Sequence, residues 1–215
     1  MSLPALRVPS LDRTIIHFDR ALRTLSGVRQ SDRPNPAAGL PDPAISPAER
    51  RQAGRLMRVN HCGEICAQAL YLGQGLTADN DATRHEMERA AREEQDHLAW
   101  CEDRLEELDT HTSYLNPLFF GLSFAGGLVS GLMGNRVNLG FVAATEEQVV
   151  RHLDSHLQQL PETDTRSRAI IEQMKADEDQ HRTTALRHGG VDFPAPVKRL
   201  MTLLSRTMTR TTYWF

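Results

Sequence analysis

The sequence has few cysteines, few aromatic residues and no marked excess of charge of either sign. Its three cysteines, Cys62, Cys66 and Cys101, are too few for a disulfide scaffold, so we expect a reducing compartment. The formal net charge of -3 gives no whole-molecule electrostatic basis for binding nucleic acid, and we expect none as a partner. The first 25 residues contain no apolar run of signal-peptide length, which predicts neither secretion nor import into an organelle.

The chain does have the composition of a globular domain built from helices. Of its 215 residues, 40% are hydrophobic and 25% charged, which is enough to bury a core in one domain. Apolar residues recur at steps of three and four, and no run alternates with period two for long enough to form a strand. The predicted fold class is therefore all-α. We expect helices over about 11–25, 47–76, 82–108, 139–160, 165–188 and 196–209.

Prolines and capping residues divide the chain into three predicted parts. The stretch 31–47 holds five prolines and is predicted to be an extended linker. Ser46 as cap, Pro47 at the first helical position and Glu49 in the first turn mark the start of a long helix. Residues 79–81 are predicted to cap the next helix, and 163–165 another. We expect residues 1–46 to form a helix and linker, 47–190 a four-helix bundle, and 191–215 a C-terminal helix with a basic and aromatic tail packed on the bundle.

Ionisable side chains interrupt the predicted core faces of four of these helices. Burying a carboxylate costs several kcal/mol even after relaxation. Because the net stability of a domain is only about 5–15 kcal/mol, several such groups need compensation, which a metal can supply. The residues concerned are Glu64, Glu94, His97, Glu146, Glu178 and His181.

The spacing of these residues indicates the kind of metal site. Two helices each carry a Glu-x-x-His pair, whose members share one helix face, and two others each carry a single Glu. That set is the ligand inventory of ferritin-like di-iron and di-manganese bundles. Four carboxylates would balance two divalent cations, and hard oxygen donors with two imidazoles favour iron or manganese. The sequence predicts a ferritin-like four-helix bundle that binds two metal ions.

Three neighbouring residues are weaker candidates for the same site. Glu93 and Asp177 each directly precede a candidate ligand and could orient the imidazoles of the opposite helix, although plain solvated charges are an equal alternative. His152 either lines the cavity or lies on the surface. Glu147 follows the solvated side of its helix with Arg151 and is predicted to be no ligand.

An uncharged stretch lies between the second and third bundle helices. Residues 112–135 include no charge, which is borderline for a transmembrane helix of about 20 apolar residues. A single span would place the two flanking helices on opposite sides of a bilayer, which a shared metal site forbids. We therefore expect a long, partly helical apolar crossover whose exposed side rests on a membrane, with an internal crossover as the alternative. The candidate membrane and substrate-access residues are Phe119, Phe120, Phe124, Leu128 and Leu132.

Four motifs together resemble the demethoxyubiquinone hydroxylase family. They are Arg58–Glu64, the Glu-x-x-His-Leu at 94–98, Ala144–Glu147 and Asp177–His181, within a resemblance that runs from about Leu11 to the C-terminus. Cys62 stands where members commonly have a small alanine-like residue.

The resemblance implies a di-iron monooxygenase that uses O2 and external electrons. Its implied substrate is a 2-polyprenyl-3-methyl-6-methoxy-1,4-benzoquinol. The resemblance further implies a peripheral protein on the cytoplasmic side of a bacterial membrane, with other ubiquinone-biosynthesis proteins and a homo-oligomer as possible partners.

Other helical metal proteins are the alternatives. A ferritin-like iron-binding or ferroxidase protein would use the same six ligands but would not need an apolar crossover. A rubrerythrin-type peroxidase would bring a Cys-x-x-Cys module, which this sequence lacks. A hydroxylase acting on tRNA would need a dense basic stripe, and none is present.

Overall fold

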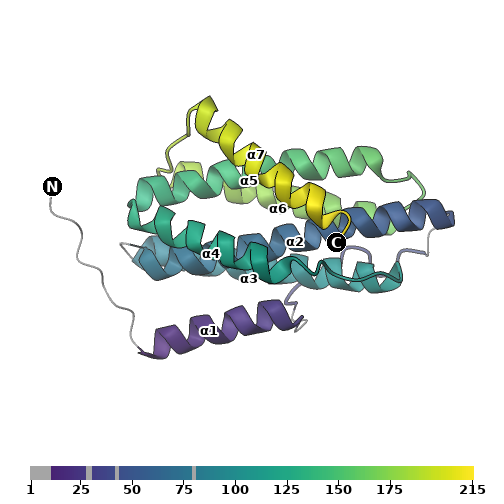
Figure 1. The fold of residues 1–215 in the computed structure, drawn as a ribbon, viewed down its shortest axis with the longest axis horizontal. Coiled ribbons are helices and arrows are strands. Elements are labelled where there is room, and N and C mark those ends of the chain that lie inside the picture. Colours follow the sequence, from purple (N-terminus) through teal and green to yellow (C-terminus); the bar gives the residue numbers. More distant parts are fainter. Residues whose placement is uncertain (1–10, 28–30, 42–43, 79–80) are drawn as a thin grey trace.

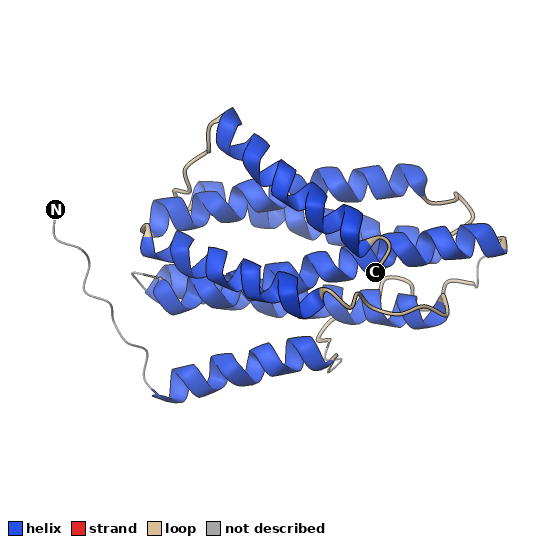
Figure 2. Cartoon of the chain, in the orientation of Figure 1, coloured by secondary structure: helices blue, strands red, loops and turns tan. Residues whose placement is uncertain are grey.

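The computed structural model describes residues 11–27, 31–41, 44–78 and 81–215, and every regular element within these ranges is a helix. The all-α prediction is confirmed (Figure 2). The helices are α1 (Leu11–Ser26), α2 (Pro47–Thr77), α3 (Asp81–Glu107), α4 (Asn116–Leu132), α5 (Asn135–Gln159), α6 (Thr165–Arg187) and α7 (Ala195–Thr212).

The four long helices α2, α3, α5 and α6 form a ferritin-like bundle. Figure 1 shows them lying side by side, with α1, α4 and α7 against the outside of the bundle. Among these four helices, the main contacts pair α2 with α3 and α5 with α6, and further contacts join the two pairs. This arrangement brings one face of each long helix to a common interior.

Capping residues set the helix starts largely as expected. The Ser46 backbone N–H donates to the Glu49 carboxylate at 2.7 Å, and Ser46 Oγ accepts from the Glu49 backbone N–H, which makes a capping box. Asp164 caps α6 by accepting from the Ser167 backbone N–H at 3.0 Å. The predicted cap at 79–81 lies partly outside the described residues, since 79 and 80 are not described.

The predicted start of α5 was wrong by several residues. The helix begins at Asn135 rather than after Asn138, because Gly134, with φ 91°, already reverses the chain at the end of α4. Glycine adopts this backbone conformation without the steric cost that other residues meet.

Helix α4 occupies most of the uncharged stretch and packs lengthwise on α2. Gly127 and Gly131 of α4 face α2: a Cβ at Gly127 would collide with the Leu70 carbonyl oxygen, and one at Gly73 of α2 with the Phe124 carbonyl oxygen. None of the helices in the described ranges is long and apolar enough to cross a bilayer.

The apolar side chains of α4 divide between the interior and the surface. Phe120 was expected on the exposed side, and this was wrong: it is 8% exposed and packs on Ile65 and Leu72 of α2. Phe119, Phe124 and Leu128 are half-buried. The exposed apolar side chains at and beside α4 are Leu118, Leu122, Val129, Leu132 and Met133.

Polar residues of the 58–64 motif tie α2 to its neighbours. The Arg58 guanidinium donates to the His111 carbonyl at 2.9 Å and so holds the segment after α3. The Asn60 side-chain oxygen lies 2.7 Å from His156 Nδ1 on α5. His61 Nε2 lies 3.1 Å from Glu102 on α3. These bonds fix the helix that carries Glu64.

Candidate metal centre

The six predicted ligands meet in the interior of the bundle. Helix α2 supplies Glu64, α5 supplies Glu146, and α3 and α6 each supply a Glu-x-x-His pair. All six are buried, with no residue more than 7% exposed. Ligand atoms of Glu64, Glu94, His97 and Glu178 lie within 4.8 Å of one another, a buried group that could hold a metal ion. His181 Nδ1 joins the group at 3.1 Å from a Glu178 oxygen.

Electrostatics show that the carboxylates crowd one another. Burial raises the pKa of Glu64 well above its usual range, and repulsion from Glu94 and Glu178 adds to this effect. Glu146 shows the same pattern: burial raises its pKa first, and then the charges of Glu178 and Glu94. Burial alone would lower the pKa of His97, but hydrogen bonds to the surrounding carboxylates raise it well above normal. Negative charge is thus concentrated at one buried place, where cations would bind.

Unsatisfied oxygen atoms show that the residues fit a metal. Within the described part of the chain, Glu146 Oε2 is buried without a hydrogen-bond partner, and Glu94 Oε1 and Glu178 Oε1 form no hydrogen bond of good geometry, although they lie 3.3 Å from His181 Nδ1 and 3.1 Å from His97 Nδ1. Leaving such an acceptor unpaired costs about 1–3 kcal/mol, and more when it is charged. Hard oxygen atoms of this kind, together with two imidazoles, are the donors that suit iron or manganese.

Each histidine is held from behind by a carboxylate of the opposite helix. His97 Nε2 of α3 lies 2.9 Å from Asp177 of α6, and His181 Nε2 of α6 lies 2.6 Å from Glu93 of α3. The Nδ1 atoms consequently face the centre. Burial would raise the pKa of Asp177, but hydrogen bonds from His97 and Arg33 lower it to about 2. Such carboxylates set the tautomer and the orientation of a ligating imidazole.

Two residues of the site were missed from the sequence. The Tyr71 hydroxyl donates to Glu146 Oε1 and is fully buried with it. A signal existed, because Tyr71 lies two helical turns after Glu64 on the same face. Arg33 contacts Asp177 from the linker at 2.9 Å, and no helical periodicity could have placed it there.

His152 makes its ring contact with another histidine. Its ring centroid lies 3.9 Å from that of His156. Burial lowers the pKa of His152 to about 4; burial and then the charge of His152 lower that of His156 to about 2. Among the described interactions, none joins His152 to the six central residues.

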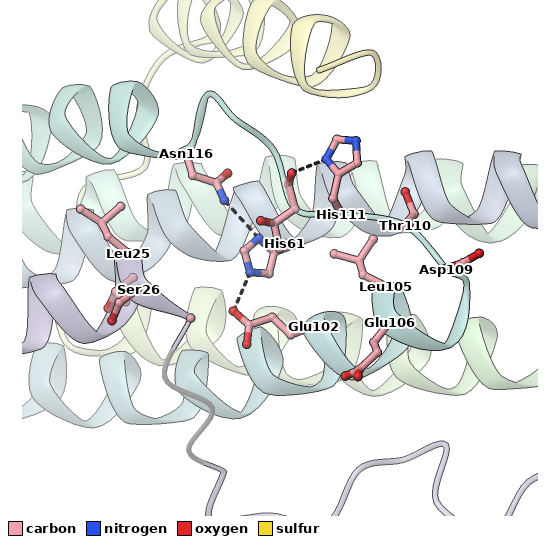
Figure 3. A pocket seen from close by; sticks show the side chains of 13 residues that line it. Leu25, Ser26, His61, Glu102, Leu105, Glu106, Asp109, Thr110, His111 and Asn116 are labelled. Carbon is pink, nitrogen blue, oxygen red and sulfur yellow. Dashed lines mark hydrogen bonds and ion pairs between the residues drawn. The ribbon is translucent and has the colours of Figure 1, made fainter.

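Two pockets lie near the centre. A narrow one reaches His181 and is lined mainly by apolar side chains, including Met87, Leu139 and Val142, together with Tyr71. The other is a polar cavity of about 450 Å³ between the end of α1, α2, α3 and the segment before α4. Figure 3 shows Glu102 and Asn116 pointing at His61 there. None of the six predicted ligands lines this cavity.

Comparison with known proteins agrees with this geometry. The family model for "Ubiquinone biosynthesis protein COQ7" matches residues 51–212. A 3-demethoxyubiquinol 3-hydroxylase of Ectopseudomonas mendocina is 58% identical over 206 residues, which cover 94% of this chain and 95% of that protein. One from Nitrosomonas europaea is 55% identical over 205 residues, covering 95% and 99% respectively. The chain belongs to the COQ7 family of ubiquinone biosynthesis proteins.

Proposed function

We propose that this protein is a di-iron monooxygenase of ubiquinone biosynthesis. Its substrate would be a 2-polyprenyl-3-methyl-6-methoxy-1,4-benzoquinol, which it would hydroxylate at the unsubstituted ring carbon. The observation that carries the proposal is the burial of four carboxylates and two imidazoles inside the bundle, with ligand atoms of Glu64, Glu94, His97 and Glu178 within 4.8 Å of one another. The relatives named 3-demethoxyubiquinol 3-hydroxylase support the substrate, since they match almost the whole chain.

Two iron ions held by Glu64, Glu94, His97, Glu146, Glu178 and His181 would supply the activation of O2. One oxygen atom enters the ring C–H bond and the other leaves as water, which consumes a pair of external electrons and two protons. Glu94 and Glu178, each on a helix that also carries a candidate histidine ligand, would be among the residues that hold these ions.

The surrounding residues would hold these ligands in place. Asp177 and Glu93 orient the two imidazoles, and Tyr71 fixes one oxygen of Glu146. The packed apolar residues around the centre limit access by water. One pocket of the described part of the chain is lined by His181 and so reaches a candidate ligand.

The substrate tail calls for a membrane surface, and the exposed apolar side of α4 supports one. Leu118 and Leu122 are 56% and 62% exposed, and Leu132 is 48% exposed. Helix α7 adds exposed leucines and the exposed basic residues Arg199, Arg206 and Arg210, a combination suited to a lipid interface. We propose peripheral attachment to the cytoplasmic side of the bacterial membrane, where other ubiquinone-biosynthesis proteins or further copies of this chain could assemble.

Anaerobic reconstitution tests the function directly. The protein is loaded with ferrous iron, mixed with the quinol, a reductant and O2, and the product is weighed by mass spectrometry. We expect a product one oxygen atom heavier and an uptake of about two irons per chain. Glu146→Gln serves as the inactive control. Uptake of many irons per chain into a closed shell, without hydroxylated quinol, would instead identify a ferritin-like ferroxidase.

A further inference from the structure

The two histidine ends of the metal centre differ, although the bundle repeats the same motif. At one end His97 is fully buried, and the Asp177 carboxylate behind it is 16% exposed. At the other end His181 is 7% exposed, and the Glu93 carboxylate behind it is 37% exposed. The hydrogen bonds are alike, so the difference lies in what covers each carboxylate.

Arg33 covers the His97 end. Its guanidinium lies 2.9 Å from Asp177 and donates to Asp96 at 2.6 Å. It also lies over the Trp100 ring, 4.8 Å from the centroid, and 3.4 Å from His97 Nε2. A planar guanidinium held by two carboxylates and an aromatic face has little freedom to rotate.

The linker is fastened to α3 at the same point. Asp96 Oδ1 accepts from the backbone N–H groups of Asp32 and Arg33 at 2.7 and 3.3 Å, and from Ser31 Oγ at 3.0 Å. Because Asp96 directly precedes His97, the anchor of the linker and the candidate ligand are adjacent on one helix. The segment that begins at Ser31 thus closes this end of the centre.

The His181 end has no matching cover among the described residues. The charge of Arg89 acts on Glu93, but Arg89 is 51% exposed and pairs with Glu86 at 2.6 Å. The narrow pocket lined by Tyr71, Met87 and Leu139 reaches His181 itself. One end is therefore covered by an arginine from outside the bundle, which is itself 35% exposed, and the other opens to a pocket.

We propose that Arg33 is a positioning residue that fixes Asp177 against His97, so that the linker makes the His97 end of the centre the slower of the two to exchange metal. This inference rests on the proposed function of the centre as a site for two irons. A ligand whose imidazole is held in one orientation binds its metal more tightly, and loss of such outer contacts typically costs about 10–100-fold in affinity. Arg33 acts one contact further out, so we expect the lower end of that range, about tenfold.

Metal release measures this asymmetry without relying on turnover. Protein loaded anaerobically with ferrous iron is mixed with excess ferrous chelator, and the coloured complex is followed in time. The wild-type protein should release its iron in a fast and a slow phase. Arg33→Gln should accelerate the slow phase about tenfold and leave the fast phase unchanged. Arg33→Lys, which keeps the charge but loses the planar fork, should fall between them.

Arg166→Gln is the matched control. Arg166 of α6 donates to the Leu40 carbonyl of the linker at 2.7 Å and to Glu107 of α3 at 3.0 Å. It therefore also joins the linker to α3, but Glu107 lies at the end of α3, away from the metal centre. It should release iron at the wild-type rates. Equal acceleration in both variants would mean that general docking of the linker matters, which would overturn the role of Arg33.

Two further outcomes separate this inference from the proposed function. If the wild-type protein holds two irons and Arg33→Gln releases both at unchanged rates, the inference is wrong and the metal centre stands. If the wild-type protein binds no iron, the proposed function fails and the inference fails with it.

Discussion

The interior of the bundle holds ionisable side chains, and the outer faces of α1, α4 and α7 expose apolar ones. Each region thus departs from the usual distribution of residues in a folded protein. Inside, six ionisable side chains are almost inaccessible to solvent. Outside, large apolar side chains are exposed, among them Phe18 of α1 at 64%, Leu122 of α4 at 62% and Leu204 of α7 at 64%. Fully buried charges are rare unless paired, and clustered exposed apolar groups mark interaction surfaces.

The difference shows how much more a polar site specifies than an apolar one. The interior donors have fixed identities and positions, so they define the chemistry that would complete them, a cation that prefers oxygen and imidazole ligands. The exposed apolar side chains indicate only that contact with another apolar surface would be favoured over contact with water. Tests of the interior should therefore give all-or-none results, and tests of the surface graded ones.

Removal of a central carboxylate should have the largest effect. Glu94→Ala or Glu178→Ala should abolish tight binding of the two irons, because each removes a buried carboxylate from the group of possible ligands. Helicity measured by circular dichroism should be largely kept, since the alanine side chain also relieves carboxylate repulsion. Full iron occupancy in either variant, measured by plasma emission, would refute the ligand assignment.

Two adjacent glutamates on α5 offer a sharper comparison between interior and surface. Glu146 is 1% exposed and bonded to Tyr71, whereas Glu147 pairs with Lys198 of α7 at 2.6 Å and with Arg151. Glu146→Gln should eliminate hydroxylation. Glu147→Gln should keep it and lose at most about 1 kcal/mol of stability, the value of an exposed ion pair. The reverse activities would show that α5 is rotated from the arrangement described.

Charges on the outer face of α4 should change location more than chemistry. Leu118→Glu with Leu122→Glu should shift the protein from vesicles to the soluble fraction, because each charge in an apolar zone costs about 2–3 kcal/mol. Iron content should be unchanged, and activity should fall on a long-tailed quinol in vesicles but much less on a short-tailed analogue. Equal loss on both substrates would show that this face serves the core. Phe120→Glu is the contrast: Phe120 is buried, so this variant should unfold at lower temperature.

The smallest effect concerns His152 and His156 of α5, whose rings contact each other. The folded-state pKa values of His152 and His156, about 4 and about 2, lie below the ordinary value of 6.5. Between pH 6.5 and these lower values, the unfolded chain therefore binds more protons than the folded protein does. The contribution of the two histidines to stability is present above pH 6.5 and is lost as the pH falls toward 4. His152→Gln with His156→Gln should flatten the dependence of unfolding free energy on pH in this window. The exposed His85→Gln is the control, and an unchanged slope in the double variant would contradict the burial effect.

The sequence indicated which Glu and His side chains are buried together better than it indicated their surroundings, for physical reasons. Glu-x-x-His pairs on apolar faces are local patterns, so the helix period alone brought Glu94, His97, Glu178 and His181 together. The period also contained an unused signal: Phe120 and Gly127 are seven residues apart, so both belong to the face of α4 that packs on α2. Arg33 could not be found in this way, because it reaches the site from an extended segment through tertiary contacts.

The most direct test of the whole account is the position of the metal. Crystals of the iron-loaded protein, measured at energies on both sides of the iron absorption edge, would give an anomalous difference map that shows iron alone. The account predicts two neighbouring peaks inside the bundle, bounded by Glu64, Glu94, His97, Glu146, Glu178 and His181. A single peak, no peak there, or iron bound at other residues would contradict it.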